Sequence, residues 1–508
     1  MRLARNDLPH SPLNDPPMAA ETELKLRIAP RDAARIGRLP WLAGVRAKSL
    51  QLGNLYYDTD QRDLATRGVA LRHRVIGRRW FVTVKSRLSS SAGLAVRSEW
   101  EYPCAPGELD FSGVADEALR TKLEHLRPHL APRFSTDFRR RLWLFEPHRD
   151  LIVEVAVDQG RIVSGERIGT LCEIELELKH GHPQALYEIA LEIAGHLPVL
   201  PENRSKAERG HRLSLGIADS PTGASDVSID ADTTPIEAFR RLALACIDHL
   251  LANAEGVRQH DDPEYIHQAR VAIRRLRALL KVFSAVLPSG FAADYNPAWR
   301  NFAAALGDAR DRDVLVGETL AEIARHFDGH DGIERFLSYA KSQRDRARES
   351  ARMALLDKEP GILILRFLGD LSRLPESPPD ADIKGLARAQ LARRARRIRK
   401  ECQRIAGMSI EELHRLRIQF KRLRYAVEFF TPLLKKGSSA RYLPQIKAMQ
   451  ETLGRINDLE RALAFEAMAP DATRCELVEG WLMASQNAAI ATLPALAREF
   501  LARRDPWA

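Results

Sequence analysis

Apolar and polar residues alternate with a period of two through the first half of the chain, from about residue 19 to 218. This period places successive side chains on opposite faces of a strand. The segments with this pattern are ETELKLRI, LGNLYYDT, VALRHRV, RWFVTVKSR, AVRSEWEY, RRLWLFE, LIVEVAVDQG, RIVSG and TLCEIELELK. Helical inserts are expected at 30–39, 114–126 and 183–196. About eight or nine antiparallel strands with only short helices predict a closed or nearly closed β-barrel.

The pattern becomes helical from about residue 235 onward, where long runs of Ala, Leu, Arg and Glu replace the alternation. Residues 219–234 are rich in Ser, Thr, Asp and Pro, which is the composition of a linker. Residues 1–18 are rich in Pro and Asn and are expected to form a disordered leader. The chain is therefore predicted to be an α+β multidomain protein, with a β-barrel domain at 19–218 and an all-α domain at 235–508.

The helical half contains an internal repeat. One copy reads YIHQARVAIRRLRALLKVF and the other reads ELHRLRIQFKRLRYAVEFF. Aligning His267 with His414 gives an offset of 147 residues, and at the same offset LGDARDRD falls on LGRINDLE. Two matched segments that hold one offset predict a duplicated helical bundle, with copies at about 240–370 and 385–505.

The composition of the chain limits its possible binding partners but does not indicate an activity. The 508 residues carry a formal net charge of +10, which favours an anionic partner such as nucleic acid, polyphosphate, a phosphorylated metabolite or acidic lipid. No pair of the five cysteines has metal-ligand or redox spacing, so a reducing compartment is expected. No apolar run is long enough to span a membrane, and the N-terminus lacks the apolar core of a signal peptide. A cytoplasmic protein is therefore expected.

Acidic side chains share one face of two predicted strands. They are Glu21 and Glu23 in the first strand, and Glu173, Glu175 and Glu177 in the last. One such strand is more often half-buried with a solvated charged face. A row of three like charges, about 7 Å apart along a strand, repels itself unless a cation lies nearby. Because hard divalent ions take carboxylate ligands, the two sets facing each other would make a metal site.

Basic residues recur with the same alternation on the intervening strands. They are Arg72 and Arg74, then Lys85 and Arg87, then Arg97 beside Glu99 and Glu101. If these faces point inward, burying so many unpartnered charges would be prohibitive. A hydrated channel that holds a metal and a polyanion removes that cost. A triphosphate, with about four negative charges, is in proportion to a ring of about six basic groups.

The order of these motifs resembles that of the CYTH family, also called triphosphate tunnel metalloenzymes. The pentapeptide ETELK from Glu21 resembles the family's ExExK signature, and YYDT, LRHR, TVK, RSEWEY, FSTDF, VDQG, EIELELK and SKAERG follow in family order across about 20–215. The resemblance implies an eight-stranded antiparallel barrel that forms a tunnel. It also implies hydrolysis of inorganic triphosphate, with a divalent metal, usually Mg²⁺ or Mn²⁺, held by glutamates.

Carried over position by position, the resemblance implies three groups of site residues. The metal ligands are Glu21 and Glu23 with a pair from Glu173, Glu175 and Glu177, and the triplet leaves the pair open. The phosphate-binding residues are Arg72, Arg74, Lys85, Arg97 and Arg140, although three consecutive arginines at 139–141 leave the inward one open. The candidate catalytic residues are Glu23, Lys25 and Lys206, and either lysine could neutralise the leaving phosphate. Glu154 and Asp158 share a face and are candidates to assist.

The repeated helices each carry a basic stripe. The first stripe is His267, Arg270, Arg274, Arg277 and Lys281, and the second is His414, Arg417, Lys421 and Arg424. Their spacing keeps each set within one stripe of a helix. A charge run is usually a solvated face, but the same stripe on two duplicated helices favours a shared polyanion groove. The repeats resemble the CHAD domain, which implies polyphosphate binding and a place on polyphosphate granules.

Other functions stay open at this point. The barrel could act on thiamine triphosphate, or convert ATP to cyclic AMP, and the chain could be a non-catalytic protein of polyphosphate granules. A third basic stretch, LARRARRIRK from Leu391, leaves contact with a membrane surface or nucleic acid open. No aromatic residue interleaves it, so sequence-specific recognition of nucleic acid is not expected.

Overall fold

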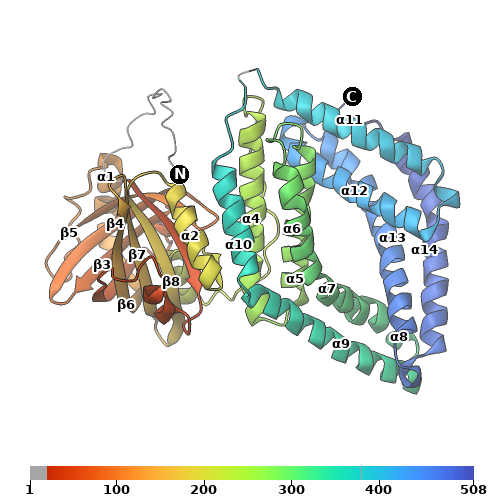
Figure 1. Cartoon of the computed structure of the whole chain (residues 1–508), viewed down its shortest axis with the longest axis horizontal. Helices are drawn as coiled ribbons and strands as arrows, with labels where there is room; N and C mark the ends of the chain where they lie inside the picture. Colours follow the sequence, from red (N-terminus) through yellow and green to blue (C-terminus); the bar gives the residue numbers. More distant parts are fainter. Residues whose placement is uncertain (1–19, 379, 508) are drawn as a thin grey trace. The chain divides into compact units, whose positions relative to one another are not determined.

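The structure is a computed structural model that describes residues 20–378 and 380–507 (Figure 1). The leader predicted at 1–18 lies outside the described residues. Contacts divide the chain into two compact units, which are treated separately below. The first comprises Met1–Ala190 with Pro201–Ala218, and the second comprises Leu191–Leu200 with Asp219–Ala508.

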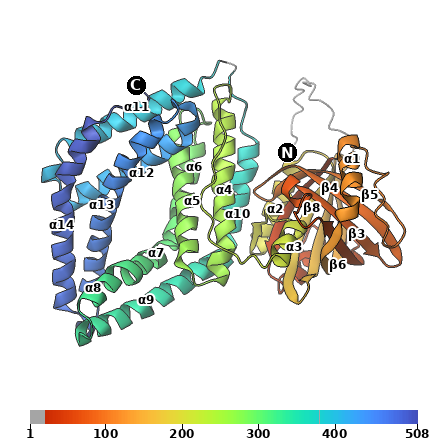
Figure 2. The ribbon, with the colours of Figure 1, turned by 180° about the vertical axis from the view of Figure 1, so that it is seen from behind.

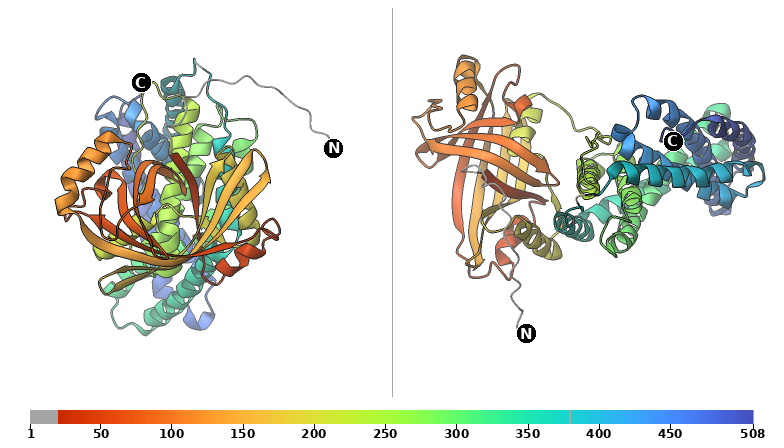
Figure 3. Two further views of the ribbon diagram at one scale, coloured as in Figure 1. Left: turned by 90° about the vertical axis from the view of Figure 1, so that its left-hand side faces the viewer. Right: turned by 90° about the horizontal axis from the view of Figure 1, so that it is seen from above.

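A closed antiparallel β-barrel forms the first unit and confirms the predicted fold. Its strands are β1 (Ala20–Ile28), β2 (Lys48–Asp58), β3 (Val69–Ile76), β4 (Arg79–Ser91), β5 (Leu94–Pro103), β6 (Ala131–His148), β7 (Leu151–Ser164) and β8 (Arg167–His180). They run in the order β5-β4-β3-β2-β6-β7-β8-β1, and β5 also pairs with β1 to close the barrel. The short strand β9 (Val199–Pro201) follows β1 in the sheet. The left view in Figure 3 shows the strands curving round the interior.

Several strands are longer than the sequence pattern predicts, β6 and β7 among them. The segments LIVEVAVDQG and RIVSG were expected as separate strands but form the single strand β7, in which Gly160 pairs with Phe138 of β6. A Cβ at Gly160 would lie 2.1 Å from the carbonyl oxygen of Asp137, so the glycine permits close approach of two strands and does not mark a turn. The strand β6 also begins earlier than expected, at Ala131.

Short helices lie between the strands, and three of them fall within the inserts predicted at 30–39, 114–126 and 183–196. The short helices are η1 (Ala33–Arg38), η2 (Ala65–Arg67), α1 (Glu117–Leu126), η3 (Arg127–His129), α2 (Gln184–His196) and α3 (Lys206–Ser214). The sequence pattern did not indicate α3. It begins where the Ser205 side chain accepts a hydrogen bond from the Glu208 backbone N–H, which makes Lys206 the first residue of the helix.

Both faces of β1 are buried, which explains how charges enter the barrel. Leu24 and Leu26 are 0% exposed on one face, while Glu23 and Lys25 are 2% and 3% exposed on the other. In the register with β8, Glu23 lies opposite Glu177. Because side chains of paired residues point to the same side of a sheet, the acidic faces of β1 and β8 line the same interior.

Helices make up the second unit from Pro235 onward, which confirms the predicted all-α half (Figure 2). The α-helices are α4 (Pro235–Gln259), α5 (Pro263–Val282), α6 (Phe291–Ala305), α7 (Gly307–Val314), α8 (Leu320–His326), α9 (Asp331–Leu356), α10 (Glu359–Ser372), α11 (Ile383–Cys402), α12 (Ile410–Phe430), α13 (Ser438–Ala467) and α14 (Glu476–Ala502). The π-helical turn η4 (Leu315–Thr319) joins α7 to α8, and short 3₁₀ turns are η5 (Ile405–Gly407), η6 (Thr431–Leu433) and η7 (Asp471–Thr473).

The two repeated segments occupy matching and contacting helices. The basic stripes lie on α5 and α12, which pack against each other, and the LG motifs lie on α7 and α13, which also make contact. Asp262 caps α5, and Ser409 with Glu412 forms a capping box on α12. These caps fix where each striped helix begins.

Replacing Gly210 tests how closely α3 must approach the barrel. A Cβ at Gly210 would lie 2.0 Å from Cε2 of Phe134 on β6. We expect Gly210→Val to lower the free energy of unfolding by about 1–3 kcal/mol, because overpacking forces the helix away. The measurement is denaturant unfolding followed by circular dichroism. Gly480→Ala in α14, where a Cβ would meet nothing within 4 Å, is the matched control and should be neutral or stabilising. Equal stability of Gly210→Val and wild type would contradict the close packing.

Candidate functional site

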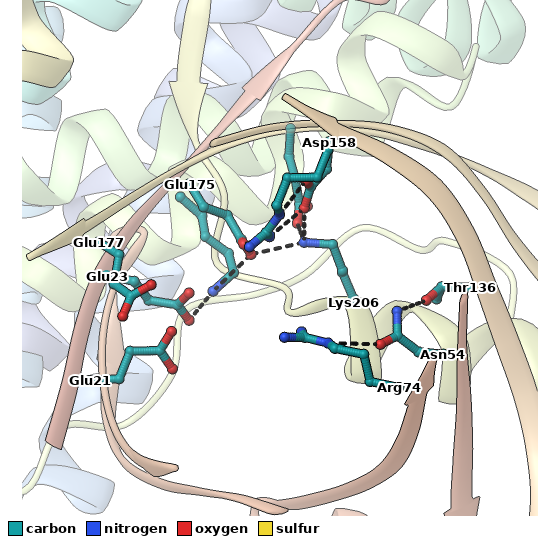
Figure 4. Close-up of polar contacts among 12 residues, drawn as sticks. Glu21, Glu23, Asn54, Arg74, Thr136, Asp158, Glu175, Glu177 and Lys206 are labelled. Atoms are coloured by element: carbon teal, nitrogen blue, oxygen red, sulfur yellow. Dashed lines mark hydrogen bonds and ion pairs between the residues drawn. The ribbon is translucent and has the colours of Figure 1, made fainter. Parts of the chain in front are cut away.

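A cavity of about 570 Å³ lies in the barrel interior and collects nearly all the residues predicted for the tunnel. The predicted residues that line it are Glu21, Glu23, Lys25, Arg72, Arg74, Lys85, Arg97, Arg140, Glu175, Glu177 and Lys206. They come from β1, β3, β4, β5, β6, β8 and α3, so seven separate elements converge on one space. Figure 4 shows Glu21, Glu23 and Glu177 gathered on one side, with Arg74 reaching in from another.

Only Arg140 of the three consecutive arginines lines the cavity. Its Nε donates to Asp158 Oδ1 at 2.8 Å, and it also binds Glu175. Arg139 donates to the hydroxyl of Ser49, and Arg141 donates to the carbonyl oxygen of Ala33. Strand alternation explains the difference, since the middle residue of three points to the opposite face from its neighbours.

Arg72 has unused hydrogen-bonding capacity inside the barrel. It is 6% exposed, and its Nη1 donates to the Tyr56 hydroxyl at 3.2 Å. Its Nε and Nη2 atoms are buried without a hydrogen-bond partner, and the carboxylates of Glu99 and Glu101 each lie 4.0 Å from Nη2. A buried guanidinium with free donors is costly unless a ligand satisfies them. An anionic ligand in the cavity would do so.

The neighbouring cations pair with acids across the strands. Arg74 Nη1 lies 2.9 Å from Glu101, and Lys85 Nζ lies 2.6 Å from Glu21 and 3.1 Å from Glu99. Burial alone would lower the pKa of Lys85, but Glu21 and Glu99 raise it above its usual value. These ion pairs hold the side chains in place at the cavity wall.

A second network is centred on Lys206 at the start of α3. Its Nζ lies 2.7 Å from Asp158 and 2.9 Å from Glu175, and it also binds Glu173. Arg209, one turn further along α3, binds Glu173 as well. Burial would raise the pKa of Glu175, but Lys206 and Arg140 hold it well below its usual value. The residues Asp158, Glu173 and Glu175 are close enough to share a metal ion, with ligand atoms within 4.8 Å of one another, but cationic side chains already surround them.

The pKa of Glu177 is raised, whereas that of Glu175 is lowered. Burial, Glu21 and Glu154 all raise the pKa of Glu177, to about 7, and the contact with Lys179 only partly offsets them. Glu154 pairs in register with Glu177 across β7 and β8 and also lines the cavity. Like charges brought together in a buried place favour either a proton or a cation. The residues Glu21, Glu154 and Glu177 therefore fit a divalent ion by their chemistry, since all are carboxylates. Lys85 pairs with Glu21 and Lys179 with Glu177, and the pKa of Glu177 stays raised despite these contacts.

Several cavity residues were not assigned from the sequence. Glu99 and Glu101 were noted on the face of Arg97 but given no role, and Tyr56, Arg62, Arg87, Lys179, His211 and Arg212 also line the cavity. Arg209 could have been found from its place three residues after Lys206 on a helix. Glu173, expected as a metal ligand, is 0% exposed and is not among the residues that line the cavity.

In the helical unit, five of the predicted basic residues from the two repeats form a cluster, here called the central cluster. They are His267, Arg270 and Arg274 of α5, and Arg417 and Lys421 of α12. The Nε atoms of Arg270, Arg274 and Arg417 are buried without a hydrogen-bond partner, as is Nδ1 of His267. The nearest acid is Asp458, 3.8 Å from Arg417.

Burial and repulsion between neighbouring cations lower pKa values in this cluster. Burial, Arg417 and Arg274 lower the pKa of Lys421 to about 6. Burial, Arg310 and Arg274 lower the pKa of His267 to about 3. Too many positive charges share the region, so an anion bound there would be stabilised and would raise these pKa values.

The other stripe residues have neighbours outside the central cluster. Arg277 contacts Asn296 at 3.3 Å, and His414 contacts Asn457 at 2.6 Å. Arg424 lies 2.9 Å from Glu428 and is paired with it. Lys281 lines a separate cavity beside α11. The shared groove expected from the spacing remains a prediction.

Comparison with known families agrees with both halves. Residues 19–210 match the CYTH domain, and residues 241–465 match the CHAD domain. The chain carries a CYTH domain followed by a CHAD domain. Over 204 residues it is 33% identical to a Haemophilus influenzae protein named inorganic triphosphatase, a match that covers 39% of this chain and 55% of that protein. The chain thus spans about half the length of that curated relative.

Solved structures resemble each domain. The CHAD domain from the plant Ricinus communis is 31% identical, with a TM-score of 0.50, and the match covers 57% of this chain and 99% of that one. A Hippeastrum protein described as an adenylyl cyclase with a dominant triphosphatase activity is 20% identical, with a TM-score of 0.30, and the match covers 38% of this chain and 95% of that one.

A helix that could cross a membrane is absent from the part of the chain that the structure describes. None of its helices combines the length and the apolar character needed to cross a bilayer.

The raised pKa of Glu177 makes the stability of the CYTH domain depend on pH. Because its folded pKa, about 7, lies above the usual 4.5, the folded state holds more protons than the unfolded state between these values. The contribution of Glu177 to stability therefore falls as pH rises from about 4.5 to 7. We expect Glu177→Gln to raise the melting temperature more at pH 8 than at pH 5, measured with EDTA present. An equal shift at both pH values would contradict the raised pKa.

Proposed function

We propose that the CYTH domain hydrolyses inorganic triphosphate with a divalent metal, Mg²⁺ or Mn²⁺. The observation that carries the proposal is the pairing, in one cavity, of unsatisfied donors on Arg72 with undercompensated acids at Glu154 and Glu177. The donors of Arg72 suit an anion, and the two acids suit a cation. A metal-bound polyphosphate supplies both, and the name of the Haemophilus influenzae relative supports triphosphate as the substrate.

The phosphate chain would lie against the basic wall of the cavity. Arg72 offers two free donors, and Arg74 and Lys85 lie on the same side through β3 and β4. Arg97 and Arg140 complete the set from β5 and β6. Phosphoryl transfer needs little covalent help from a protein, so holding the chain in line and neutralising its charge are the main tasks of these residues.

The metal would be held by Glu21, Glu154 and Glu177, with Glu23 beside them. A bound divalent ion supplies charge neutralisation at the phosphate oxygens and lowers the pKa of water. The other acids have a different role in this proposal. Glu173 and Asp158 orient Lys206, whose ammonium group is thereby aimed at the cavity and can neutralise the leaving phosphate. Lys25, next to Glu23 and 3.7 Å from Glu175, is the second candidate for that task.

For the CHAD domain we propose polyphosphate binding at the central cluster. Its cations have buried donors without partners and few acids nearby, which suits a polyanion. Among residues 20–378 and 380–507, no acidic group suited to a metal is found at this cluster, so this site is assigned binding without chemistry. The proposed location is the cytoplasm, on polyphosphate granules. Thiamine triphosphate, ATP and a purely binding role are the alternatives that a substrate panel separates.

Replacing Arg72 tests the tunnel assignment. We expect Arg72→Gln to reduce phosphate release from triphosphate by about 10²-fold, because a preorganised donor to the phosphate chain is lost. We expect Glu177→Gln to raise the Mg²⁺ or Mn²⁺ concentration needed for half-maximal activity. The assay is release of orthophosphate across a panel of triphosphate, thiamine triphosphate and ATP. Arg78→Gln, at an exposed position of the β3–β4 hairpin, is the matched control and should keep full activity. Absence of activity in wild type, or full activity in Glu23→Ala, would refute the proposal.

The lowered pKa of Lys421 predicts proton uptake when polyphosphate binds. At pH 8 the amine is largely neutral in the free protein, because its pKa is about 6. A bound polyanion favours the charged form, so the complex takes up about one proton at pH 8 and much less at pH 5.5. Calorimetric titration in buffers of different ionisation enthalpy measures this uptake. Lys421→Arg should keep binding and lose the uptake, whereas Lys435→Gln, at an exposed position, should change neither. Uptake that persists in Lys421→Arg would show that another group titrates.

A further inference from the structure

A second basic cavity in the CHAD domain is lined by residues of α5, α11 and α12. Figure 1 shows the course of these helices. Its volume is about 290 Å³, and it is lined by Ala278, Lys281, Arg393, Arg394, Arg397, Ile398, Gln419 and Arg422. We call it the α11 pocket. It shares no lining residue with the central cluster. Three of its five cations come from the stretch LARRARRIRK, whose role the sequence left open.

The charges of the α11 pocket are not compensated within the protein. Its lining contains five basic side chains and no acid. Among the described residues, none of these five is within ion-pair distance of a carboxylate. Burial, Arg393 and Arg422 lower the pKa of Arg394 to about 10, and burial, Arg422 and Arg277 lower the pKa of Lys281. The cations thus repel one another across the cavity, which a bound anion would relieve.

Some of these side chains are already held in place. Arg393 Nη2 donates to Gln390 Oε1 at 2.8 Å, and Arg394 Nη1 donates to the Gln390 carbonyl oxygen at 2.9 Å. Arg394 Nη2 also reaches the carbonyl oxygen of Lys281 at 3.4 Å, which ties α11 to α5. Neutral acceptors orient the guanidinium groups without cancelling their charge. Preorganised cations of this kind bind phosphate oxygens at a low entropic cost.

The shape and composition of the pocket favour a phosphoanion over a nucleic acid. A single strand of nucleic acid is typically held by aromatic side chains that stack on its bases, and the pocket has none. An apolar face for a membrane is also absent from its lining, where Ala278 and Ile398 are the apolar members. Five cations around a small cavity suit a compact, highly charged group.

We propose that the α11 pocket is a second phosphate-binding site of the CHAD domain, which holds a distant part of a polyphosphate chain bound at the central cluster. The proposal rests on polyphosphate binding at that cluster. The helix α5 connects the two sites, since it carries Arg274 of the cluster and, two turns further, Lys281 of the pocket. The distance of seven residues along a helix is about 10 Å. A long chain can therefore contact both sites, whereas triphosphate is too short to occupy both fully.

The test removes two cations from the pocket and compares a matched pair from the same helix. Arg393 and Arg397 line the pocket at exposed positions, whereas Arg388 and Arg396 are exposed on α11 outside it. The double variants R393Q/R397Q and R388Q/R396Q lose equal charge. Full-length proteins are titrated with long polyphosphate and with triphosphate at increasing salt, and melting curves confirm that each variant is folded.

We expect R393Q/R397Q to bind long polyphosphate about ten-fold more weakly than R388Q/R396Q at low salt. The slope of log affinity against log salt should fall by about 1.4, at about 0.7 for each lost contact with a flexible polyanion. Binding and hydrolysis of triphosphate should be the same in both variants. Equal affinity of the two variants for long polyphosphate would overturn the second site and leave the central cluster standing. Failure of wild type to bind polyphosphate would overturn both, and an equal loss for triphosphate would show an independent pocket for small anions.

Discussion

The charge balance inside the barrel is the constraint on which the rest of the structure depends. Eight strands turn one face inward, and that face carries acids and bases close to equal number. A buried charge without a partner is strongly destabilising. The barrel avoids this cost through cross-strand pairs such as Arg74 with Glu101 and Lys85 with Glu99. Within this balance, Arg72 and Glu177 are two exceptions among the described residues, and each suits a ligand of the opposite charge.

The helical domain treats its charges differently. The central cluster and the α11 pocket concentrate cations with few acids, so the side chains lower one another's pKa values. Repulsion among these cations destabilises the protein without a ligand, and a bound anion would relieve it. The same residue types, Arg and Lys, therefore have different consequences in the two domains. On the strands they alternate with acids that can hold a metal ion, whereas on the helices they are clustered with few acids nearby.

Much of this organisation could be predicted from the sequence, because period-two alternation and a repeat at a constant offset are local signals. The ExExK signature places Glu21, Glu23 and Lys25 on one strand face, and the strand face lines the cavity. Three features escaped prediction because they depend on distant contacts. The choice of Arg140 depends on the pairing of β6, and the orientation of Lys206 depends on the packing of α3. The place of Lys281 beside the arginines of α11 depends on the approach of α11 to α5.

Cations that have acidic partners and cations that lack them respond differently to the release of a phosphate. In the barrel, Arg74 and Lys85 keep acidic partners to which they remain paired when the cavity holds only water. Departure of a product then leaves these two cations paired, and the free donors of Arg72 are the part of the wall that loses a partner. In the central cluster, departure of an anion restores the repulsion among Arg270, Arg274 and Lys421. Under the functions proposed above, the helical domain would therefore retain a polyanion more strongly than the barrel would retain its product.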